Sequence, residues 1–190
     1  MAIECLPTAI PEVKLIKPRV FPDSRGFFQQ SYHERQYQEA GIDIRFVQDN
    51  WSRSAKGILR GLHYQLEHAQ SKLVSVIRGE VFDVVVDIRR GSPTFGRWIG
   101  ETLSDKNHYQ LFIPKGFAHG FCVLSEEVDL LYKCDDFYAP GDEYGIRWDD
   151  PGIGIEWPAE DFCLSEKDEI LPCLNCVPVE KLPRYSKQTI

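Results

Sequence analysis

The stretch Leu73–Ile77 (LVSVI), Arg78–Glu80 (RGE), Val81–Ile88 (VFDVVVDI) carries the strongest structural signal in the chain. Both outer runs are rich in valine and isoleucine, which is typical of buried β-strands. The short segment between them contains a glycine and is typical of a turn. The stretch therefore predicts two strands joined as a β-hairpin.

Further short apolar runs follow at similar spacing on the C-terminal side, separated by segments rich in Gly, Pro, Asp and Ser. They are Trp98–Leu103, His108–Ile113, Ala118–Leu124, Val128–Lys133 and Gly145–Trp148. Helical signals are few: a short helix over His33–Ala40, ended by Gly41, and a capping box that begins at Ser165. Many short strands without long helices predict an all-β, antiparallel jelly-roll sandwich or barrel with a few short helices.

The composition is that of a globular protein, with 190 residues, 43% hydrophobic and 27% charged. We expect one domain over residues 1–190, with a core of about 10–170 and a surface-hugging C-terminal extension of about 171–190. The net charge of −7 argues against nucleic acid and against an anionic membrane surface as partners. It leaves room for one small anionic ligand. We expect no membrane span and no secretory leader, and hence a cytoplasmic protein.

Six scattered cysteines include the pair Cys173 and Cys176, a CxxC motif. A chain of this length needs no disulfides, and no second ligand pair follows the motif, so free thiols are the favoured interpretation. A metal or redox role for the pair stays an alternative.

Two histidines stand in segments that could carry chemistry. His63 follows Arg60 by three positions within an apolar run, so the two side chains should point to opposite faces of a strand unless a bulge intervenes. A second histidine, His119, follows the turn Pro114–Gly116. Gly-x-His followed later by Pro-x-Gly-x-x-His suggests a cupin-like jelly roll. Metal-binding cupins place a second histidine two residues after the first, but here Gln65 stands there, a poor transition-metal ligand. We therefore expect no metal.

At this point the sequence resembles the dTDP-4-dehydrorhamnose 3,5-epimerase family. The matching segments occur in order between about residues 10 and 170: Asp23–Phe28 (DSRGFF), Gln48–Asn50 (QDN), Leu59–Gln65 (LRGLHYQ), Lys72–Val74 (KLV), Pro114–Phe121 (PKGFAHGF), Tyr132–Lys133 (YK), Phe137–Pro140 (FYAP) and Ile155–Pro158 (IEWP). The resemblance implies a jelly roll, a homodimer and an isomerase without cofactor or metal. Its substrate would be dTDP-4-dehydro-6-deoxy-D-glucose, on the route to dTDP-L-rhamnose and cell-surface polysaccharide.

The resemblance also implies roles for individual residues. His63 matches the base that removes a proton beside the 4-keto group, Asp168 its carboxylate partner, Tyr132 the acid on the opposite face, and Lys72 the residue that faces the keto oxygen. Tyr138 matches the ring stacked on thymine. The other positions matched to contacts with the sugar nucleotide are Arg25, Gln48, Asn50, Arg60, His119, Glu143 and Lys167.

One position departs from the family pattern: Gln30 stands where relatives commonly have Glu. Glutamine keeps the hydrogen-bonding shape without the charge, so we retain Gln30 as a substrate-binding candidate with an altered contact. Without the resemblance, Tyr138, Glu143 and Lys167 would be read as ordinary surface residues.

The chemistry of these roles is coherent on its own terms. Removing a proton next to a carbonyl needs a base poised near neutrality and a donor for the developing enolate charge, and inversion needs a second acid on the other face. Two alternatives stay open from the sequence: an enzyme that inverts only C3 or C5 of a related dTDP-4-keto-deoxysugar, and a non-catalytic sugar-nucleotide-binding cupin.

Overall fold

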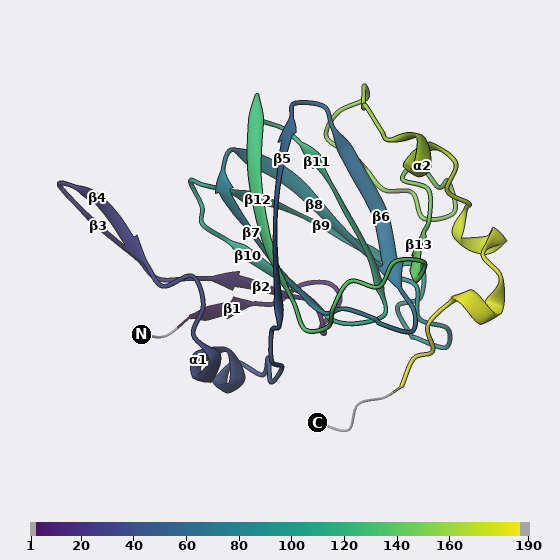
Figure 1. Cartoon of the computed structure of the whole chain (residues 1–190), viewed down its shortest axis with the longest axis horizontal. Coiled ribbons are helices and arrows are strands. Elements are labelled where there is room, and N and C mark those ends of the chain that lie inside the picture. The colour runs from purple at the N-terminus through teal and green to yellow at the C-terminus, as the bar shows by residue number, and fades with distance from the viewer. Residues whose placement is uncertain (1–2, 187–190) are drawn as a thin grey trace.

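The computed structural model describes residues 3–186, so residues 187–190 of the expected extension lie outside the described part of the chain. Two antiparallel sheets form its body (Figure 1). In spatial order the six-stranded sheet contains β1 (Glu4–Leu6), β2 (Lys14–Lys17), β10 (Gln110–Ile113), β7 (Lys72–Arg78), β12 (Glu127–Cys134) and β5 (Gln48–Ala55). The five-stranded sheet contains β13 (Glu143–Gly145), β6 (Leu59–Gln65), β11 (Phe117–Val123), β8 (Glu80–Asp87) and β9 (Trp98–Ser104). The predicted antiparallel all-β class is confirmed.

The predicted hairpin between β7 and β8 is wrong, although both strands exist. β7 pairs with β10 and β12, whereas β8 pairs with β11 and β9 in the other sheet. The turn between them carries the chain from one layer to the other. Gly79 adopts a φ of +85°, and its N–H donates to the Asp105 carboxylate rather than across a hairpin. Both strands are apolar because each is buried within a sandwich, a pattern that does not distinguish a hairpin from a corner between sheets.

The space between the sheets changes character along its length. On β12, Val128 and Leu130 are fully buried in the main core, and the next side chain on the same face is Tyr132. On β11, Phe121 belongs to that core, and His119, two residues before it, lies on the same face. One half of the interior is therefore a hydrophobic core, and the other half collects polar side chains.

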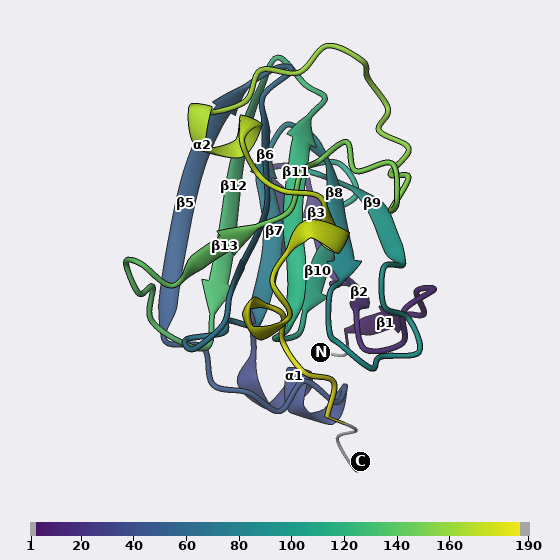
Figure 2. The same cartoon turned by 90° about the vertical axis from the view of Figure 1, so that its right-hand side faces the viewer.

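The outer faces of the two sheets are covered by different segments. Helix α1 (Glu34–Glu39) packs its Tyr37 against Ile16, Leu73 and Phe112 of the six-stranded sheet. The C-terminal segment, with two 3-10 turns at Leu174–Cys176 and Val179–Lys181, crosses the five-stranded sheet (Figure 2). Leu174, Val177 and Leu182 are buried where this segment packs on the sheet.

The first thirty residues contain four strands that the sequence did not predict, because their apolar runs are short and prolines stand within or next to three of them. Two of them, β3 (Val20–Asp23) and β4 (Gly26–Gln29), form a separate hairpin that projects from the body at the left of Figure 1. Phe27 and Phe28 on this arm are 60% and 61% exposed. A large exposed aromatic pair on a projecting hairpin is typical of an interaction surface.

The predicted short helices are confirmed as α1 and α2 (Glu166–Glu169). The Ser165 hydroxyl accepts a hydrogen bond from the Asp168 N–H, as the capping box predicts. The strand expected over Gly145–Trp148 instead covers Glu143–Gly145. No helix in residues 3–186 is long and apolar enough to cross a membrane.

Candidate active site

The polar half of the sandwich contains a cavity of two connected lobes. The larger lobe has a volume of about 650 Å³ and the smaller about 110 Å³. Both lobes share one set of lining residues: His63, Lys72, His119, Tyr132 and Glu143. The larger lobe adds Arg60, Lys167 and Asp168, and the smaller adds Gln65, Gln70 and Tyr138. Nine of the thirteen predicted site residues therefore lie around one cavity.

A bulge in β6 brings Arg60 and His63 to the same cavity. His63 pairs with His119, and Arg60 pairs with Phe121. Between these two pairs β6 contains one residue more than β11, which defines a β-bulge. At the bulge, Gly61 has a φ of +115°, and a Cβ there would lie 2.7 Å from the Gly120 Cα. Only glycine fits this close approach of two backbones. Arg60 and His63 therefore do not point to opposite faces of the strand, because the bulge that the sequence analysis named as the exception is present.

His63 forms a short hydrogen bond with Asp168. His63 Nε2 lies 2.6 Å from Asp168 Oδ1, while Asp168 Oδ2 accepts the Gly61 N–H at 3.3 Å. Burial opposes ionisation of this carboxyl, but its hydrogen bonds from His63 and Gly61 outweigh burial and lower the pKa of Asp168. The carboxylate therefore fixes the orientation of the His63 ring, as the carboxylate partner of a histidine base does. The other ring nitrogen, Nδ1, lies 3.8 Å from Glu143 Oε1.

Lys72 and Tyr132 face His63 from the opposite sheet. Lys72 Nζ lies 5.8 Å from the centre of the Tyr132 ring, and none of the described side chains forms an ion pair with it. Burial lowers the pKa of Lys72 and raises the pKa of Tyr132. A half-buried ammonium without an ion-pair partner among the described side chains is positioned to stabilise negative charge on a ligand, and a protonated phenol can donate a proton.

His119 is part of a second pair that the sequence interpretation missed. Its Nε2 lies 2.9 Å and 3.0 Å from the two oxygens of Asp83, a carboxylate with no exposed surface. The signal for Asp83 was present in the sequence, since it is an acidic residue inside the apolar run of β8. Such a residue needs a buried partner, and His119 on β11 supplies it.

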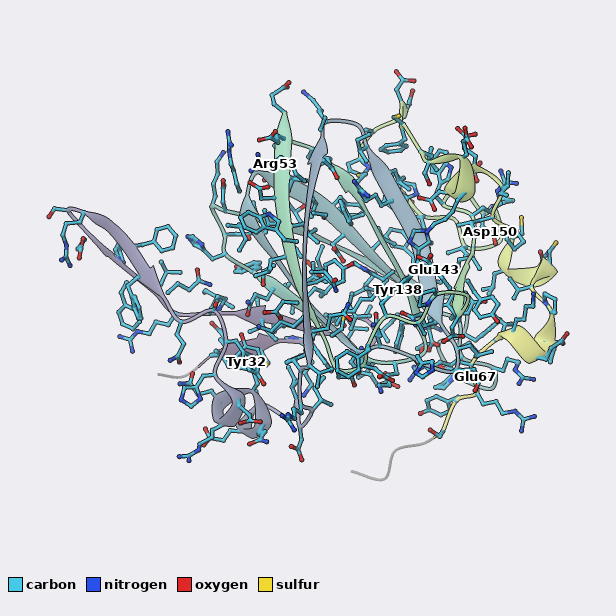
Figure 3. All side chains as sticks on the ribbon, viewed as in Figure 1. Tyr32, Arg53, Glu67, Tyr138, Glu143 and Asp150 are labelled. Carbon is cyan, nitrogen blue, oxygen red and sulfur yellow. The ribbon has the colours of Figure 1, made fainter. Side chains whose placement is uncertain are left out.

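Charged and aromatic side chains surround the opening of the cavity. Lys167 Nζ lies 2.8 Å from Glu143 Oε2, and half of the Tyr138 surface is exposed. Figure 3 labels Tyr138 and Glu143, which lie near each other beside β6 and β13. These residues can contact the exposed part of a ligand whose reacting part is buried beside His63.

Gln48 and Asn50 support this opening from β5. Gln48 Oε1 accepts the Tyr138 N–H at 3.0 Å, and its amide nitrogen donates to Asn50 Oδ1 at 3.1 Å. Asn50 donates in turn to the buried Cys134 thiol. Neither residue lines the cavity within this chain, so the structure brings them beside the site rather than into it.

Arg25 and Gln30 lie outside the cavity of their own chain. Arg25 is near the tip of the projecting hairpin, with 88% of its side chain exposed and an ion pair to Asp23. Gln30 accepts a hydrogen bond from Gln36 of α1. Within one chain these two predicted substrate contacts are not assembled with the other residues.

The described part of the chain contains no cluster of three or more His, Cys, Asp or Glu side chains that could hold a metal ion. All six cysteines are free thiols, including Cys173 and Cys176. What the cavity does contain is a histidine hydrogen-bonded to a carboxylate on one side, and a tyrosine and a lysine on the other.

The chain matches a family model described as dTDP-4-dehydrorhamnose 3,5-epimerase over residues 7–175. It belongs to this family. The epimerase of this name from Pseudomonas aeruginosa is 60% identical over 162 residues, which cover 84% of this chain and 90% of that protein. A crystal structure of dTDP-6-deoxy-D-glucose-3,5-epimerase from Legionella pneumophila, in complex with dTDP-4-keto-L-rhamnose, superposes with a TM-score of 0.95. It is 54% identical, and the match covers 97% of this chain and 99% of that one.

The family also includes enzymes with a narrower activity. A dTDP-4-dehydrorhamnose 3-epimerase from Streptomyces niveus is 40% identical over 165 residues, which cover 86% of this chain and 80% of that protein. Family membership therefore supports the jelly-roll fold and the epimerase class.

Proposed function

We propose that this protein is an isomerase that converts dTDP-4-dehydro-6-deoxy-D-glucose to dTDP-4-dehydro-L-rhamnose by inverting C3 and C5. The observation that carries the proposal is the placement of base and acid on opposite walls. His63 belongs to the five-stranded sheet and Tyr132 to the six-stranded sheet, and both line the same cavity. A sugar ring held between them would meet a base on one face and an acid on the other.

The proposed reaction begins when His63 takes the proton from the carbon next to the keto group. The electrons of the C–H bond then form the enolate, whose oxygen carries the negative charge that the Lys72 ammonium stabilises. Asp168 holds the imidazolium that results. The Tyr132 hydroxyl returns a proton to the same carbon from the opposite face, and the keto group re-forms with the centre inverted. His63 then releases its proton to solvent and Tyr132 takes one up, which restores the acid and the base. The same four residues can then act at the second carbon, since C3 and C5 both flank the C4 keto group.

An enzyme that inverts one centre is the second candidate, favoured by the similarity to the Streptomyces niveus 3-epimerase. A sugar-nucleotide-binding cupin without activity is the third, but binding alone requires neither the short His63–Asp168 bond nor an opposed tyrosine. Incubation with the 4-keto-6-deoxy sugar nucleotide in deuterated water separates the three. Label at C3 and C5 of an inverted product supports the proposal, label at one carbon supports the second candidate, and no label supports the binder.

We also propose that the reaction needs no metal or other cofactor, because Gln65 stands where a metal cupin would place its second histidine. Treatment with an excess of a chelator, followed by buffer exchange, should leave kcat and KM unchanged. Recovery of lost activity by one divalent ion would overturn this part of the proposal.

We propose further that the working unit is a homodimer in which the β3–β4 arm delivers Arg25 to the partner's cavity. The exposed Phe27 and Phe28 on the arm, and Trp51 (68% exposed) and Ile77 (52% exposed) on the outer face of the six-stranded sheet, offer apolar contact area. β2 pairs with β10 of its own sheet, so the arm after it is the part left free for a partner. Sedimentation should show a species near twice 21.9 kDa.

Subunit mixing tests the shared site directly. Arg25→Ala and His63→Ala proteins should each be nearly inactive, but a mixed dimer contains one cavity with both wild-type residues. Random mixing should therefore restore about a quarter of wild-type activity. A fully active monomer, or no recovery from a mixture shown to exchange subunits, would contradict the proposal.

We place the protein in the cytoplasm, as one epimerase domain over residues 1–190, on a route to surface polysaccharide. The support is the proposed substrate, because a sugar carried on a charged diphosphate does not cross a bilayer unaided. Neither nucleic acid nor a membrane is a proposed partner.

A further inference from the structure

Gln65 is a buried cavity residue that the proposed mechanism leaves without a role. It follows His63 by two positions on β6, so both side chains leave the strand on the same face. Gln65 lines the smaller lobe of the cavity, and only 9% of its surface is exposed. Metal-binding cupins have a histidine ligand at this position, and the side chain there points into the barrel.

The amide nitrogen of Gln65 has no hydrogen-bond partner among the described residues. The Asp142 carboxylate lies beside this amide, and its pKa is lowered partly by Gln65. The Asp142 oxygens nevertheless accept the backbone N–H groups of residues 66–68, and the Gln65 amide nitrogen forms no hydrogen bond of normal geometry with them. A buried donor without an acceptor destabilises a protein, and such groups in native structures are normally satisfied by a ligand or by water. Gln70 provides a contrast in the same lobe, because its amide nitrogen donates to the Asp136 carbonyl at 2.9 Å.

We propose that Gln65 donates a hydrogen bond to an uncharged oxygen of the bound sugar and thereby contributes to the selection of the substrate. This inference rests on the proposed function, since it takes the ligand to be a nucleotide sugar. The last torsion of a glutamine side chain is broad, so the amide can turn its N–H₂ group toward a ligand. The cations of the cavity, Lys72 and Arg60, suit phosphate or a developing negative charge, whereas a neutral amide suits a hydroxyl or keto oxygen.

Strand geometry and burial assign the oxygen to the sugar rather than to the nucleotide. The Cα atoms of His63 and Gln65 are about 7 Å apart along the strand, close to the width of a pyranose ring with its substituents. The base must touch the reacting carbon, so the amide lies level with the same ring. Tyr138, the proposed contact of the nucleobase, is half exposed at the opening, whereas Gln65 is nearly inaccessible. A buried side chain contacts the buried part of a ligand.

The test compares Gln65→Met with Gln70→Met in the full-length protein. Methionine keeps the length of glutamine and removes the donor. Titration calorimetry gives the dissociation constants of dTDP-glucose, which binds without reacting because it lacks the keto group, and of dTDP. Thermal unfolding of the unliganded proteins is measured alongside.

For Gln65→Met we expect dTDP-glucose to bind about tenfold more weakly while the affinity for dTDP stays within about twofold of wild type. The melting temperature should stay the same or rise, because the substitution removes an unsatisfied buried group. For Gln70→Met we expect a lower melting temperature and no selective loss of dTDP-glucose, because that amide is already satisfied inside the protein.

Three results would overturn the inference: equal weakening of both ligands, no weakening of either, or a fall in melting temperature that matches that of Gln70→Met. A failure of the proposed function is distinguishable from these results. In that case the wild-type protein itself would bind no dTDP-glucose or convert no 4-keto sugar, whatever residue 65 is.

Discussion

The cavity contains two histidine–aspartate pairs that differ in how they are built. His63 and Asp168 are 105 residues apart, and Asp168 sits on the four-residue helix α2 outside the sheets. His119 and Asp83 lie on neighbouring central strands. The His63 side chain is 22% exposed, whereas His119 is 8% exposed and Asp83 is fully buried.

The two pairs suit different tasks: His63–Asp168 suits proton transfer, and His119–Asp83 suits support of the fold. A histidine base must reach the ligand and become protonated during the reaction. Its ring therefore has to be accessible, and its partner has to suit both the neutral and the protonated ring. A fully buried carboxylate needs a permanent partner, because leaving it alone in the interior is costly. We therefore expect His63 to matter for rate and His119 for stability as well as for ligand contact.

The largest expected effect is that of His63→Ala on the rate. Without the base no enolate forms, so kcat should fall by roughly 10²- to 10⁴-fold. Steady-state kinetics on the 4-keto sugar nucleotide measures it. His68→Ala is the matched control, since His68 is exposed and does not line the cavity, and its kcat should stay at the wild-type level.

Tyr132→Phe should uncouple the two halves of the reaction. The ring stays and the hydroxyl is lost, so net inversion should fall by about 10²-fold or more. Deuterium exchange into recovered substrate should fall much less, because His63 still removes the proton and can return one from the original face. Mass spectrometry and NMR of recovered sugar nucleotide report both rates, and an equal loss in the two would show that tyrosine is not the opposite-face acid.

His119→Ala should cost more stability than any other change at these two pairs. It leaves Asp83 buried and unpaired, so the free energy of unfolding should fall by about 3 kcal/mol. His63→Ala should lower it by no more than about 1 kcal/mol, because Asp168 keeps the Gly61 N–H. Urea denaturation compares the variants, and equal losses would remove the distinction between the pairs. The double variant His119→Ala with Asp83→Asn should recover part of the loss.

The smallest expected effect is the pH dependence that Asp168 gives to stability. Burial opposes a low pKa here, but hydrogen bonds from His63 and Gly61 lower the pKa of the folded carboxyl below its unfolded value. The stabilisation is therefore complete above the unfolded pKa and is lost as the pH falls through the folded pKa. Asp168→Asn should be less stable than wild type by about 2 kcal/mol near neutrality, and the gap should shrink below about pH 4. A gap that stays constant down to about pH 3 would contradict the assignment.

The sequence predicted strands well and their pairing poorly. Valine-rich runs identified β7 and β8. The sequence of the turn at Gly79, however, is compatible both with a hairpin and with a connection to the other sheet. The N-terminal strands were not predicted because their apolar runs are short, and one of them, β2, pairs with β10 about ninety residues away. Pairing depends on such distant contacts, which local periodicity does not record.

The site shows the same division. Residue types and the family resemblance identified His63, Tyr132 and Asp168, yet spacing alone could not bring together residues that are 105 positions apart. The bulge at Gly61 depends on the approach of Gly120 from another strand, so Arg60 and His63 share a face only in the folded protein. In the sequence Gln65 marks only the place of a missing metal ligand, because whether its amide is hydrogen-bonded depends on neighbours that the fold brings to it.

Hydrogen exchange at the substrate tests the central claim most directly. His63→Ala protein, shown by calorimetry to bind dTDP, is incubated with the 4-keto-6-deoxy sugar nucleotide in deuterated water, and the label at C3 and C5 of recovered substrate is measured by NMR. We predict no label above the rate without enzyme, because the His63–Asp168 pair is the base. Label at C3 or C5 at a rate near that of wild type would contradict the account and assign proton removal to another group in the cavity.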